Sequence, residues 1–549
     1  MRRHRLPVNL PDPLALARRA ADEVYFVGAL AQRGILRPHP PIRLARMGLG
    51  LVTHGSVAGL LNAAALAYGD RVAISDELGT ITYAELDAHA NAIANGWIAR
   101  GLRAGDGVAI LCRNHRHFVE AFFAGGKVGA KVILLNTDFA APQLREVAER
   151  EGTDLLVHDD EYAELLAGVD VRLGRWRAWV EEGTDAGDAA GTLASLVARS
   201  SRKAPPRPSA ELKVTILTSG TTGTPKGANR PTPKSLGPIG GLLGKVPFHS
   251  GQTMVVAAPV FHSLGFATMM LGIALGDTVV LRRRFSPATC LADVAEHRAD
   301  NLVVVPVMLA RMLDQDDESG SRTDLSSLSV VLCGGSQLGA PLAERALRRI
   351  GPVVYNLYGS TEVAVATVAS PEDLALDPGT VGRVLRGSMV KLVDDQGREV
   401  PRGETGRIFV GNSIQFEGYT GGGTKELVDG LMSSGDVGHF DQHGLLHVDG
   451  RDDDMIVSGG ENVFPKEVEE LFERHPAVVE CAVIGVPDEQ FGQRLKAFVV
   501  LHEGASLDEE EARDYVRQNL ARYKVPREVV VLDELPRNPT GKVLKRELR

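Results

Sequence analysis

Cysteine is scarce in this chain, and the few cysteines are isolated. The 549 residues contain Cys112, Cys290, Cys333 and Cys481, and no two of them form a C-x-x-C pair. A disulfide framework or a structural zinc site needs paired cysteines at short spacings. The sequence therefore argues against both, and we expect four reduced, mostly buried thiols.

Long apolar runs and an excess of basic charge are also missing. No stretch reaches 18 consecutive apolar residues, so we expect no membrane-spanning helix. The net charge of -9 argues against a nucleic-acid-binding protein. The basic start, M-R-R-H-R, lacks the apolar core of a secretory signal. These absences predict a cytoplasmic protein.

The chain is too long for one hydrophobic core, and its pattern is that of an α/β fold. From Gly55 onward, short apolar strands alternate with helices, as in parallel sheets with crossover helices. Residues 181–211 are rich in Ala, Gly, Ser and Pro, which indicates a solvated connection. We predict an N-terminal extension at 1–54, a large domain of several subdomains at 55–450, and a small mobile α/β domain at 451–549.

The N-terminal extension is basic. Residues 1–50 hold nine arginines against three acidic residues, a local charge of +6 that leaves -15 for the remainder. Leu14–Arg33 predicts a helix with Val24 on its apolar face, and Ile42–Val52 predicts a second amphipathic piece. Such helices can lie on an anionic membrane, which would make the protein peripheral to it. The alternative is that the extension packs on the large domain.

The most informative motif is T-S-G-T-T-G-T-P-K-G, from Thr218 to Gly227. It follows the apolar stretch Val214–Leu217, so a buried strand leads directly into this loop. Glycines let backbone N–H groups approach a polyanion, hydroxyls add donors, and Lys226 adds a positive charge. The spacing differs from that of a Walker A loop. The motif predicts a phosphate-binding loop; its alternative is a flexible surface loop.

Further blocks follow this loop in the chain. They are P-V-F-H-S-L-G (259–265), C-G-G-S (333–336), Y-N-L-Y-G-S-T-E (355–362), S-G-D (434–436), G-R-D-D-D-M-I-V-S-G-G-E-N (450–462) and P-R-N-P-T-G-K (536–542). In type and order the blocks resemble the adenylate-forming superfamily of acyl-CoA synthetases, luciferases and peptide-synthetase adenylation domains. The chain looks most like bacterial long-chain fatty acyl-CoA synthetases.

The resemblance implies a nucleotide site. Glu362 would hold Mg²⁺, Thr361 would contact the α-phosphate, and Lys542 would neutralise charge that develops during adenylation; these three are the expected catalytic residues. Tyr358 offers a flat face for adenine, and Asp436 matches the carboxylate that accepts both ribose hydroxyls. The full set expected to bind ATP is Thr218, Ser219, Gly220, Thr221, Thr222, Gly223, Lys226, Gly334, Gly335, Ser336, Tyr358, Gly359, Asp436 and Arg451.

The resemblance also implies a second half-reaction, in which the small domain rotates about a hinge. We place the hinge at residues 451–453, with Asp453 as the pivot. Gly459, Gly460 and Glu461 would then form the face that binds CoA. Two glycines can let a pantetheine arm pass close to the backbone.

The acyl pocket is expected around His262, Phe266 and Met308. Methionines suit an alkyl chain, although they suit an ordinary core equally well. Likewise, a lone histidine is more often a satisfied core residue than a ligand-binding one. No charged residue stands out as an anchor for an amino acid, which favours a fatty acid of medium to long chain.

These features predict an ATP-dependent fatty acyl-CoA ligase that works through acyl-AMP, with Mg²⁺ and CoA. A fatty acyl-AMP ligase that loads a carrier protein is one alternative. A luciferase-like or non-catalytic AMP-binding relative is another. The loop Gly421–Gly423 departs from the family's pattern, and the sequence assigns it no role.

Overall fold

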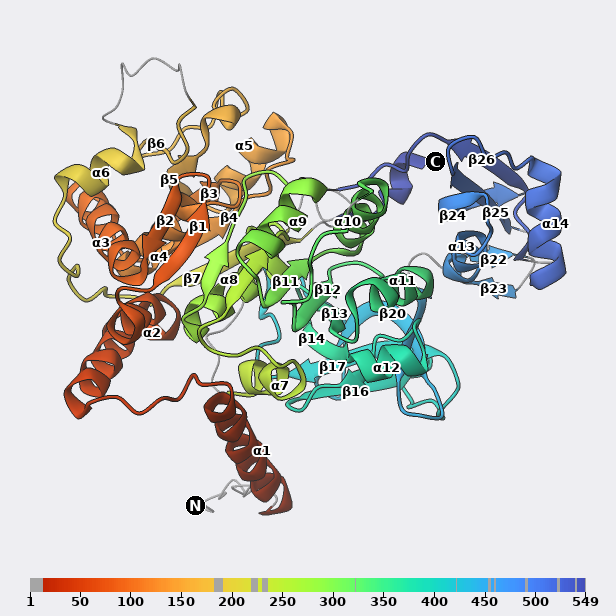
Figure 1. Ribbon diagram of the computed structural model, residues 1–549, viewed down its shortest axis with the longest axis horizontal. Coiled ribbons are helices and arrows are strands. Elements are labelled where there is room, and N and C mark those ends of the chain that lie inside the picture. Colours follow the sequence, from red (N-terminus) through yellow and green to blue (C-terminus); the bar gives the residue numbers. More distant parts are fainter. Residues whose placement is uncertain are drawn as a thin grey trace, which may run out of the picture.

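A computed structural model describes residues 13–181, 191–218, 226–229, 236–320, 322–420, 422–452, 456–458, 461–488, 492–520, 524–538 and 541–548. The chain forms a large α/β body and a smaller C-terminal domain, seen in blue at the right of Figure 1. This arrangement confirms the predicted fold class.

The central sheet of the body carries much of the site. Its strand order is β15-β14-β13-β12-β11-β9-β10-β1-β2, with parallel pairing from β13 to β1 and antiparallel strands at both edges. The strands are β1 (Val72–Asp76), β2 (Gly79–Thr82), β9 (Thr253–Val256), β10 (Thr278–Val280), β11 (Asn301–Val304), β12 (Val330–Gly334), β13 (Val354–Ser360), β14 (Ala364–Ala369) and β15 (Arg383–Val384).

A second sheet carries the predicted phosphate loop. It runs β18-β8-β7-β4-β3-β5-β6, and β3, β4, β5, β6 and β7 are parallel. Its members are β3 (Gly107–Leu111), β4 (Lys131–Leu134), β5 (Thr153–His158), β6 (Arg175–Arg177), β7 (Lys213–Thr218), β8 (Lys226–Asn229) and β18 (Gly418–Tyr419). Parallel strands of this kind are buried on both faces, which explains their near-continuous Val, Ile and Leu runs.

Helices join and cover these sheets. They are α3 (Tyr83–Ala99), α4 (Arg116–Val128), α5 (Ala141–Arg150), α6 (Leu193–Arg199), α7 (Gly237–Lys245), α8 (Ser263–Leu275), α9 (Pro287–Glu296), α10 (Pro306–Glu318), α11 (Ala340–Ile350) and α12 (Pro371–Leu376). Helix α3 starts at a capping box, in which Thr82 and Glu85 satisfy each other's backbone N–H groups. Helix α6 lies inside the stretch that we expected to be only a solvated connection, and Thr192 caps it.

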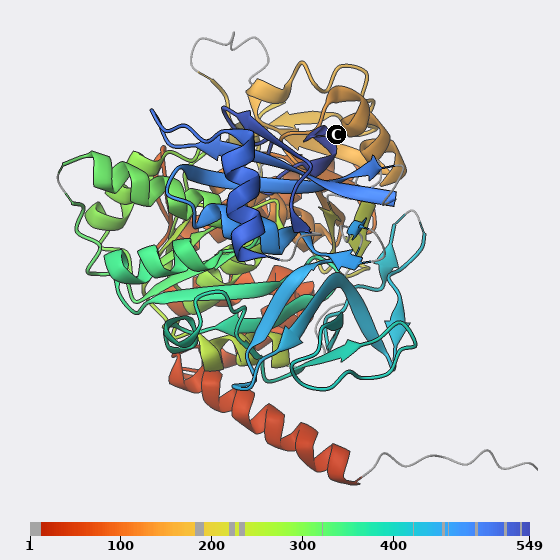
Figure 2. The ribbon, with the colours of Figure 1, turned by 90° about the vertical axis from the view of Figure 1, so that its right-hand side faces the viewer.

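A small antiparallel sheet leads toward the second domain. It consists of β16 (Ser388–Val393), β17 (Gly406–Asn412), β19 (Leu427–Val428), β20 (Leu431–Phe440) and β21 (Leu446–Arg451). The C-terminal domain then builds its own core from β22 (Ile456–Ser458), β23 (Glu461–Val463), α13 (Pro465–Glu473), β24 (Val478–Asp488), β25 (Gly492–Leu501), α14 (Glu509–Asn519) and β26 (Glu528–Leu532). Figure 2 shows this domain in front of the large body.

The N-terminal extension packs on the body and also projects from it. Helix α1 (Pro13–Gln32) lies against α7, where Phe26 and Tyr25 approach Gly240 and Gly244. Its remaining length extends from the lower edge of the molecule in Figures 1 and 2. Val24, which we expected on the packing face, is 73% exposed, because Phe26, Ala29 and Leu30 take that face.

Helix α2 (Pro41–Tyr68) is the element that bears on the expected absence of a membrane-spanning helix. Among the described residues it is the one helix long and apolar enough to cross a bilayer by length and composition. It is bent at Gly55, whose φ of 80° lies in the left-handed region. Its second half, with Leu61 and Ala64, belongs to the main core.

All four cysteines are free and buried, as the sequence predicted. Cys112 follows β3 directly, Cys333 lies within β12, and both are fully buried within the main core.

Candidate active site

The predicted phosphate loop is the connection between β7 and β8. Thr218, the last residue of β7, pairs with Lys226, the first residue of β8. Ser219, Gly220, Thr221, Thr222 and Gly223 lie outside the described residues. The Lys226 ammonium lies 5.2 Å from the centre of the Tyr419 ring, a cation–π distance. The hairpin therefore places the lysine of the motif beside β18.

Tyr358, Asp436 and Arg451, expected to bind the nucleoside, meet in the structure. The Tyr358 hydroxyl donates a 2.6 Å hydrogen bond to Oδ2 of Asp436, and Arg451 Nη1 donates to Oδ1 at 3.2 Å. Asp436 and Arg451 are register partners on β20 and β21. Burial, followed by the Asp436 charge, raises the pKa of Tyr358 well above its usual value, so its hydroxyl stays a donor.

Glu362 is held in place by two hydroxyl groups. Ser360 donates to Oε2 at 2.9 Å, and Tyr419 donates to Oε1 at 3.0 Å. Burial and then the Glu362 charge raise the pKa of Tyr419, which keeps this phenol protonated. Each carboxylate oxygen can accept further bonds, so the group retains the capacity to bind a hard cation.

Thr361 links this segment to the start of α8. Its hydroxyl lies 3.1 Å from the Ser263 hydroxyl. His262 precedes α8, and its ring centre lies 4.6 Å from that of Phe261. Burial lowers the pKa of His262 to about 4, so the ring is neutral at neutral pH. None of the described residues forms a hydrogen bond with its buried Nε2 atom, which suits a polar group of a ligand.

Glycines at the site allow neighbouring backbone segments to lie close together. Gly334 ends β12, and a Cβ there would lie 3.0 Å from the Leu357 carbonyl oxygen. Gly335 has a φ of 90° and precedes Ser336. A Cβ on Gly359 would lie 1.9 Å from the Ala364 carbonyl oxygen, which no other residue could tolerate. These glycines bring β12, β13 and β14 together behind Tyr358.

The expected acyl-pocket residues lie on neighbouring elements. The Phe266 ring on α8 stands edge-on to Phe122 at 4.9 Å between centres. Met308, on α10, is 8% exposed. Met269 and Met312 are core residues with 0% and 2% exposure, so they are less available to a substrate.

The loop of Lys542 reaches the large domain. A Cβ on Gly541 would lie 2.2 Å from the Val307 side chain, at the start of α10. The backbone N–H of Lys542 donates to Asn538, which fixes the turn. The C-terminal domain therefore presents this loop to the same end of the central sheet that carries Gly335.

Other predicted residues of the small domain are only partly described. Glu461 begins β23, whereas Asp453, Gly459 and Gly460 lie outside the described residues. Two more contacts join the domains: Gln337 donates to Glu470 at 2.9 Å, and Lys466 donates to the Val448 carbonyl.

The sequence analysis missed Tyr419 and Ser263. Tyr419 both bonds Glu362 and lies under Lys226, yet it sits 57 residues from Glu362 in the chain. The G-Y pair that precedes the glycine-rich loop is the signal that could have found it. Ser263 lies inside the P-V-F-H-S-L-G block itself.

A basic cavity opens beside this block. It has a volume of about 220 Å³ and is lined by Arg113, Asn114, Thr137, Asp138, Ala257, Pro259, Phe261, Arg282, Arg283 and Phe285. The Glu161 carboxylate accepts from Arg113, Arg283 and Arg284 at 2.7 to 2.9 Å. Arg283 also pairs with Glu181 at 3.6 Å, and Arg282 pairs with Asp293, so carboxylates offset part of this charge. Among the residues that line the cavity, three arginines outnumber one carboxylate, Asp138, which favours an anion.

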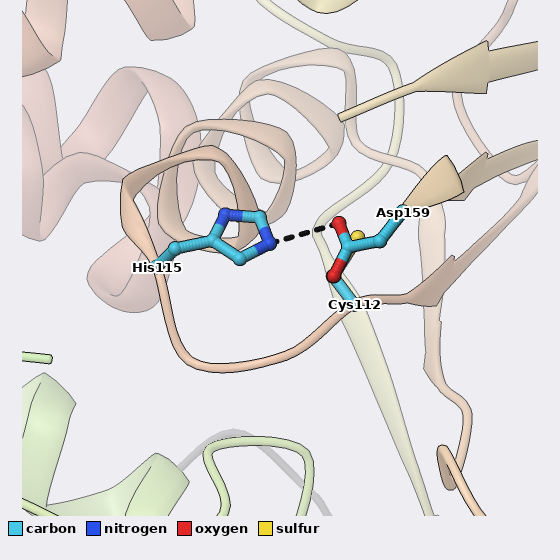
Figure 3. A group of neighbouring side chains, drawn as sticks. All are labelled: Cys112, His115 and Asp159. Carbon is cyan, nitrogen blue, oxygen red and sulfur yellow. Dashed lines mark hydrogen bonds and ion pairs between the residues drawn. The ribbon is translucent and has the colours of Figure 1, made fainter. Parts of the chain in front are cut away.

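Beneath this cavity, Cys112, His115 and Asp159 form a fully buried cluster (Figure 3). His115 Nε2 lies 2.8 Å from Asp159, which also accepts the backbone N–H of Arg113. Burial, followed by the Asp159 charge, raises the pKa of the Cys112 thiol. A neutral thiol is a poor metal ligand, and Asp159, rather than the histidine, bridges the other two groups. We therefore assign the cluster a structural role in shaping the cavity floor.

Comparisons with known proteins identify the family of the chain. Residues 61–420 match the family described as AMP-binding enzyme, and residues 467–542 match its C-terminal domain. The chain is 36% identical to a feruloyl-CoA synthase of Amycolatopsis sp. over 480 residues, which is 85% of this chain and 93% of the relative. It is 30% identical to the fatty acid–[acyl-carrier-protein] ligase ScoC of Streptomyces coeruleorubidus over 494 residues, 86% of this chain and 91% of the relative.

A solved structure has the same fold. The o-succinylbenzoate CoA synthetase (MenE) of Bacillus subtilis, in complex with the acyl-adenylate intermediate OSB-AMP, superposes with a TM-score of 0.77 at 29% identity. The match covers 89% of this chain and 97% of that chain. Together with the nucleotide-site geometry, these matches place the chain: it belongs to the AMP-binding enzymes of the adenylate-forming superfamily.

Proposed function

We propose that this protein is an AMP-forming acid–CoA ligase, which converts a carboxylic acid, ATP and CoA to acyl-CoA, AMP and pyrophosphate. The observation that carries the proposal is the Tyr358–Asp436–Arg451 cluster. Tyr358 lies on β13, the strand that leads to Glu362, and Asp436 and Arg451 join it from β20 and β21, so a ribose and the phosphates attached to it can be bound side by side.

In the first half-reaction, a carboxylate oxygen attacks the α-phosphorus of ATP. Its electron pair forms the new P–O bond, and pyrophosphate leaves with the pair of the broken bond. This step needs positioning and charge neutralisation rather than proton transfer. Lys226 and Lys542 supply positive charge, Thr361 contacts the α-phosphate, and Asp436 accepts the ribose hydroxyls.

Glu362 is the residue that would hold Mg²⁺. Its two oxygens are oriented by the Ser360 and Tyr419 hydroxyls, and a carboxylate is the ligand that Mg²⁺ prefers. When bound, the cation would offset the negative charge of the phosphates. The Tyr419 contact would keep the carboxylate from turning away toward Lys226.

In the second half-reaction, the CoA sulfur attacks the acyl carbonyl carbon, and AMP leaves with the electron pair of the C–O bond. The thiol proton is lost to solvent or to the leaving phosphate. For this step the small domain would turn about Asp453 and bring Gly459, Gly460 and Glu461 to the site. The Gln337–Glu470 contact and the packing of Gly541 on Val307 would break.

The basic cavity supports CoA as the acceptor. CoA carries a diphosphate and a ribose 3′-phosphate, whereas the pantetheine arm of a carrier protein carries one phosphodiester. Arg113, Arg282 and Arg283 line the cavity beside Phe261, which precedes His262, and Asp138 is the one carboxylate in the lining. This excess of positive charge fits the nucleotide end of CoA.

For the acid, we propose a ring attached to a short carboxyl-bearing chain. The feruloyl-CoA synthase and the o-succinylbenzoate CoA synthetase, by their names, act on acids of that kind. The half-buried Phe266 ring, which stands edge-on to the fully buried Phe122, offers an aromatic partner for a ring, since aromatic rings attract one another in such arrangements. The medium- to long-chain fatty acid favoured by the sequence is the second candidate, supported by Met308 and by the relative ScoC.

A substrate panel tests both parts of the proposal. AMP release would be measured with Mg-ATP and hydroxycinnamic, indoleacetic, succinylbenzoic and straight-chain fatty acids, each with CoA, pantetheine or no thiol. CoA-dependent turnover that is fastest with a ring acid is expected. Fastest turnover with a fatty acid would replace the first candidate by the second. Acyl-AMP that accumulates and is not consumed by CoA would refute the ligase assignment and indicate a carrier-protein acceptor.

A further inference from the structure

The N-terminal helices expose several large apolar side chains. Val24 and Val27 on α1 are 73% and 44% exposed. Leu36, in the connection to α2, is also exposed. Five more lie in the first half of α2: Ile42, Leu44, Leu49, Leu51 and Val52. Clustered exposed side chains of this size mark an interaction surface rather than ordinary surface variation.

Helix α1 is apolar on two opposite faces. Phe26, Ala29 and Leu30 are buried, and Phe26 packs against Gly240 of α7. Val24 and Val27, one turn apart on the other side, are left in solvent. A helix that is apolar all round is normally covered on all sides. The packing on α7 therefore leaves Val24 and Val27 of α1 uncovered.

The first half of α2 shows the same division. Gly50 and His54 face the protein, and Gly50 lies directly against Gly59 of the second half. Ile42, Leu49 and Val52 recur at helical spacing on the opposite side and are 75%, 65% and 67% exposed. Because the second half of α2 is fixed in the core, this helix cannot cross a bilayer without unfolding the domain. It can only lie along a surface.

The charge of the N-terminal segment indicates what kind of surface these helices contact. Arg43 and Arg46 are exposed on the same helix turn, and residues 1–50 carry a local charge of +6 against -15 for the remainder. Such an asymmetry orients the molecule with its N-terminal side toward an anionic plane and its body away from it. Two copies that met through this surface would instead bring their arginines together.

We propose that the exposed face of α1 and the first half of α2 dock this protein on the headgroup layer of an anionic lipid bilayer. The apolar side chains enter the boundary between headgroups and acyl chains, and Arg43 and Arg46 pair with lipid phosphates. The docking does not depend on which acid the enzyme activates.

Co-sedimentation of the full chain with vesicles tests the docking. Vesicles of phosphatidylcholine alone would be compared with vesicles that also contain phosphatidylglycerol. The triple variant Val24→Asp, Ile42→Asp, Val52→Asp should weaken binding to the anionic vesicles by about tenfold or more, since each change removes an inserted apolar group. The matched control Leu376→Asp, Leu427→Asp, Val479→Asp changes side chains of 50 to 54% exposure elsewhere and should bind as the unmodified protein does.

The double variant Arg43→Glu, Arg46→Glu isolates the charge. It should lose binding to anionic vesicles most clearly at low salt, and AMP release with a water-soluble acid should be unchanged. Equal binding by the unmodified protein and the apolar triple variant would overturn the proposal. So would a dimer, seen by light scattering, that becomes monomeric in the triple variant while vesicle binding is absent throughout.

Discussion

Tyr419 donates a 3.0 Å hydrogen bond to Glu362 while its ring lies 5.2 Å from the Lys226 ammonium. One side chain thus stands between the expected metal-binding carboxylate and the lysine of the phosphate loop. The two charges would otherwise attract each other in the absence of nucleotide. The phenol satisfies the carboxylate with a neutral donor and covers the lysine with a π face.

Replacing Tyr419 separates these two contacts. Tyr419→Phe removes the hydrogen bond and keeps the ring, so we expect kcat for AMP release to fall about tenfold, the range of one positioning contact. Half-saturation by Mg²⁺ should rise, because the carboxylate is less well oriented. The kcat for AMP release should fall further in Tyr419→Ala than in Tyr419→Phe. Equal activity of the phenylalanine variant and the unmodified enzyme would contradict this role.

Lys542 should act in adenylation alone. Lys542→Ala should lower acyl-AMP formation by about 10² to 10³, as the loss of one electrostatic stabiliser does. Thioester formation from synthetic acyl-AMP and CoA should continue at the unmodified rate, because the loop has then left the site. Lys545→Ala, three residues on, is the matched control. A variant that loses both half-reactions would point to a structural role instead.

The Tyr358–Asp436 pair should govern nucleotide binding. Asp436→Asn keeps the size of the side chain but removes the charge that Arg451 and Tyr358 contact. We expect KM for ATP to rise about tenfold or more, the value of a charge-assisted hydrogen bond. Tyr358→Phe should raise KM for ATP less than Asp436→Asn does. Titration with 2′-deoxy-ATP provides the check, since the unmodified enzyme should discriminate against it and Asp436→Asn should not.

The arginine cavity predicts how the enzyme distinguishes CoA from its fragments. Arg283→Ala should raise KM for CoA about tenfold and leave KM for pantetheine unchanged. For dephospho-CoA, the rise in KM caused by Arg283→Ala should lie between those for CoA and pantetheine. Arg348→Ala, on an exposed helix face, should change none of these constants. If Arg283→Ala raised KM for CoA and KM for pantetheine equally, the cavity would not be part of the CoA site.

Stability should depend on a buried carboxylate between two histidines. Burial alone would raise the pKa of Glu120, but the charges of His117 and His89 and their hydrogen bonds lower it to about 2. A lowered carboxyl pKa stabilises the fold above the unfolded value of 4.5, and this contribution is lost as pH falls toward 2. His117, whose pKa is raised by Glu120 despite its burial, contributes below pH 6.5 and loses that contribution as pH rises above its folded pKa.

Glu120→Gln tests this arrangement. Removing one partner of a buried ion pair should cost about 3 kcal/mol of unfolding free energy near pH 6. The cost should shrink toward pH 3, where the unmodified carboxylate begins to lose its own advantage. Urea unfolding across this range measures both values. If the two proteins differed in unfolding free energy by the same amount at every pH, the shape of the Glu120 side chain, and not its charge, would account for the loss of stability.

The sequence predicted most of the fold because its signals are local. The alternation of short strands and helices from Gly55 onward could be predicted because each element is encoded by apolar residues within a short stretch. The family resemblance assigned Tyr358 and Asp436 to one nucleotide site, but the hydrogen bond between them joins residues 78 positions apart and was not predicted. Tyr419 and the basic cavity were missed because their partners come from separate elements and no short pattern encodes the distance between them.

The N-terminal extension shows a different limit of prediction from sequence. A helix with apolar residues at several angles has more than one possible packing face, and only the partner decides between them. Glycines in α7 made room for Phe26 and Tyr25, so Val24 turned outward. The apparent end of the extension at residue 54 also falls at a bend within α2 rather than between two elements.

The packing of α1 on α7 has a practical meaning for anyone shortening this protein. The match to the AMP-binding family begins at residue 61, inside α2, so a chain cut there would lose residues 41–60 of that helix, including the buried Ala58. It would also uncover Gly240 and Gly244, whose surface is shaped to receive two aromatic rings. The boundary suggested by comparison with relatives is therefore a poor place to begin a recombinant chain, and yield should recover when the start moves back to α1.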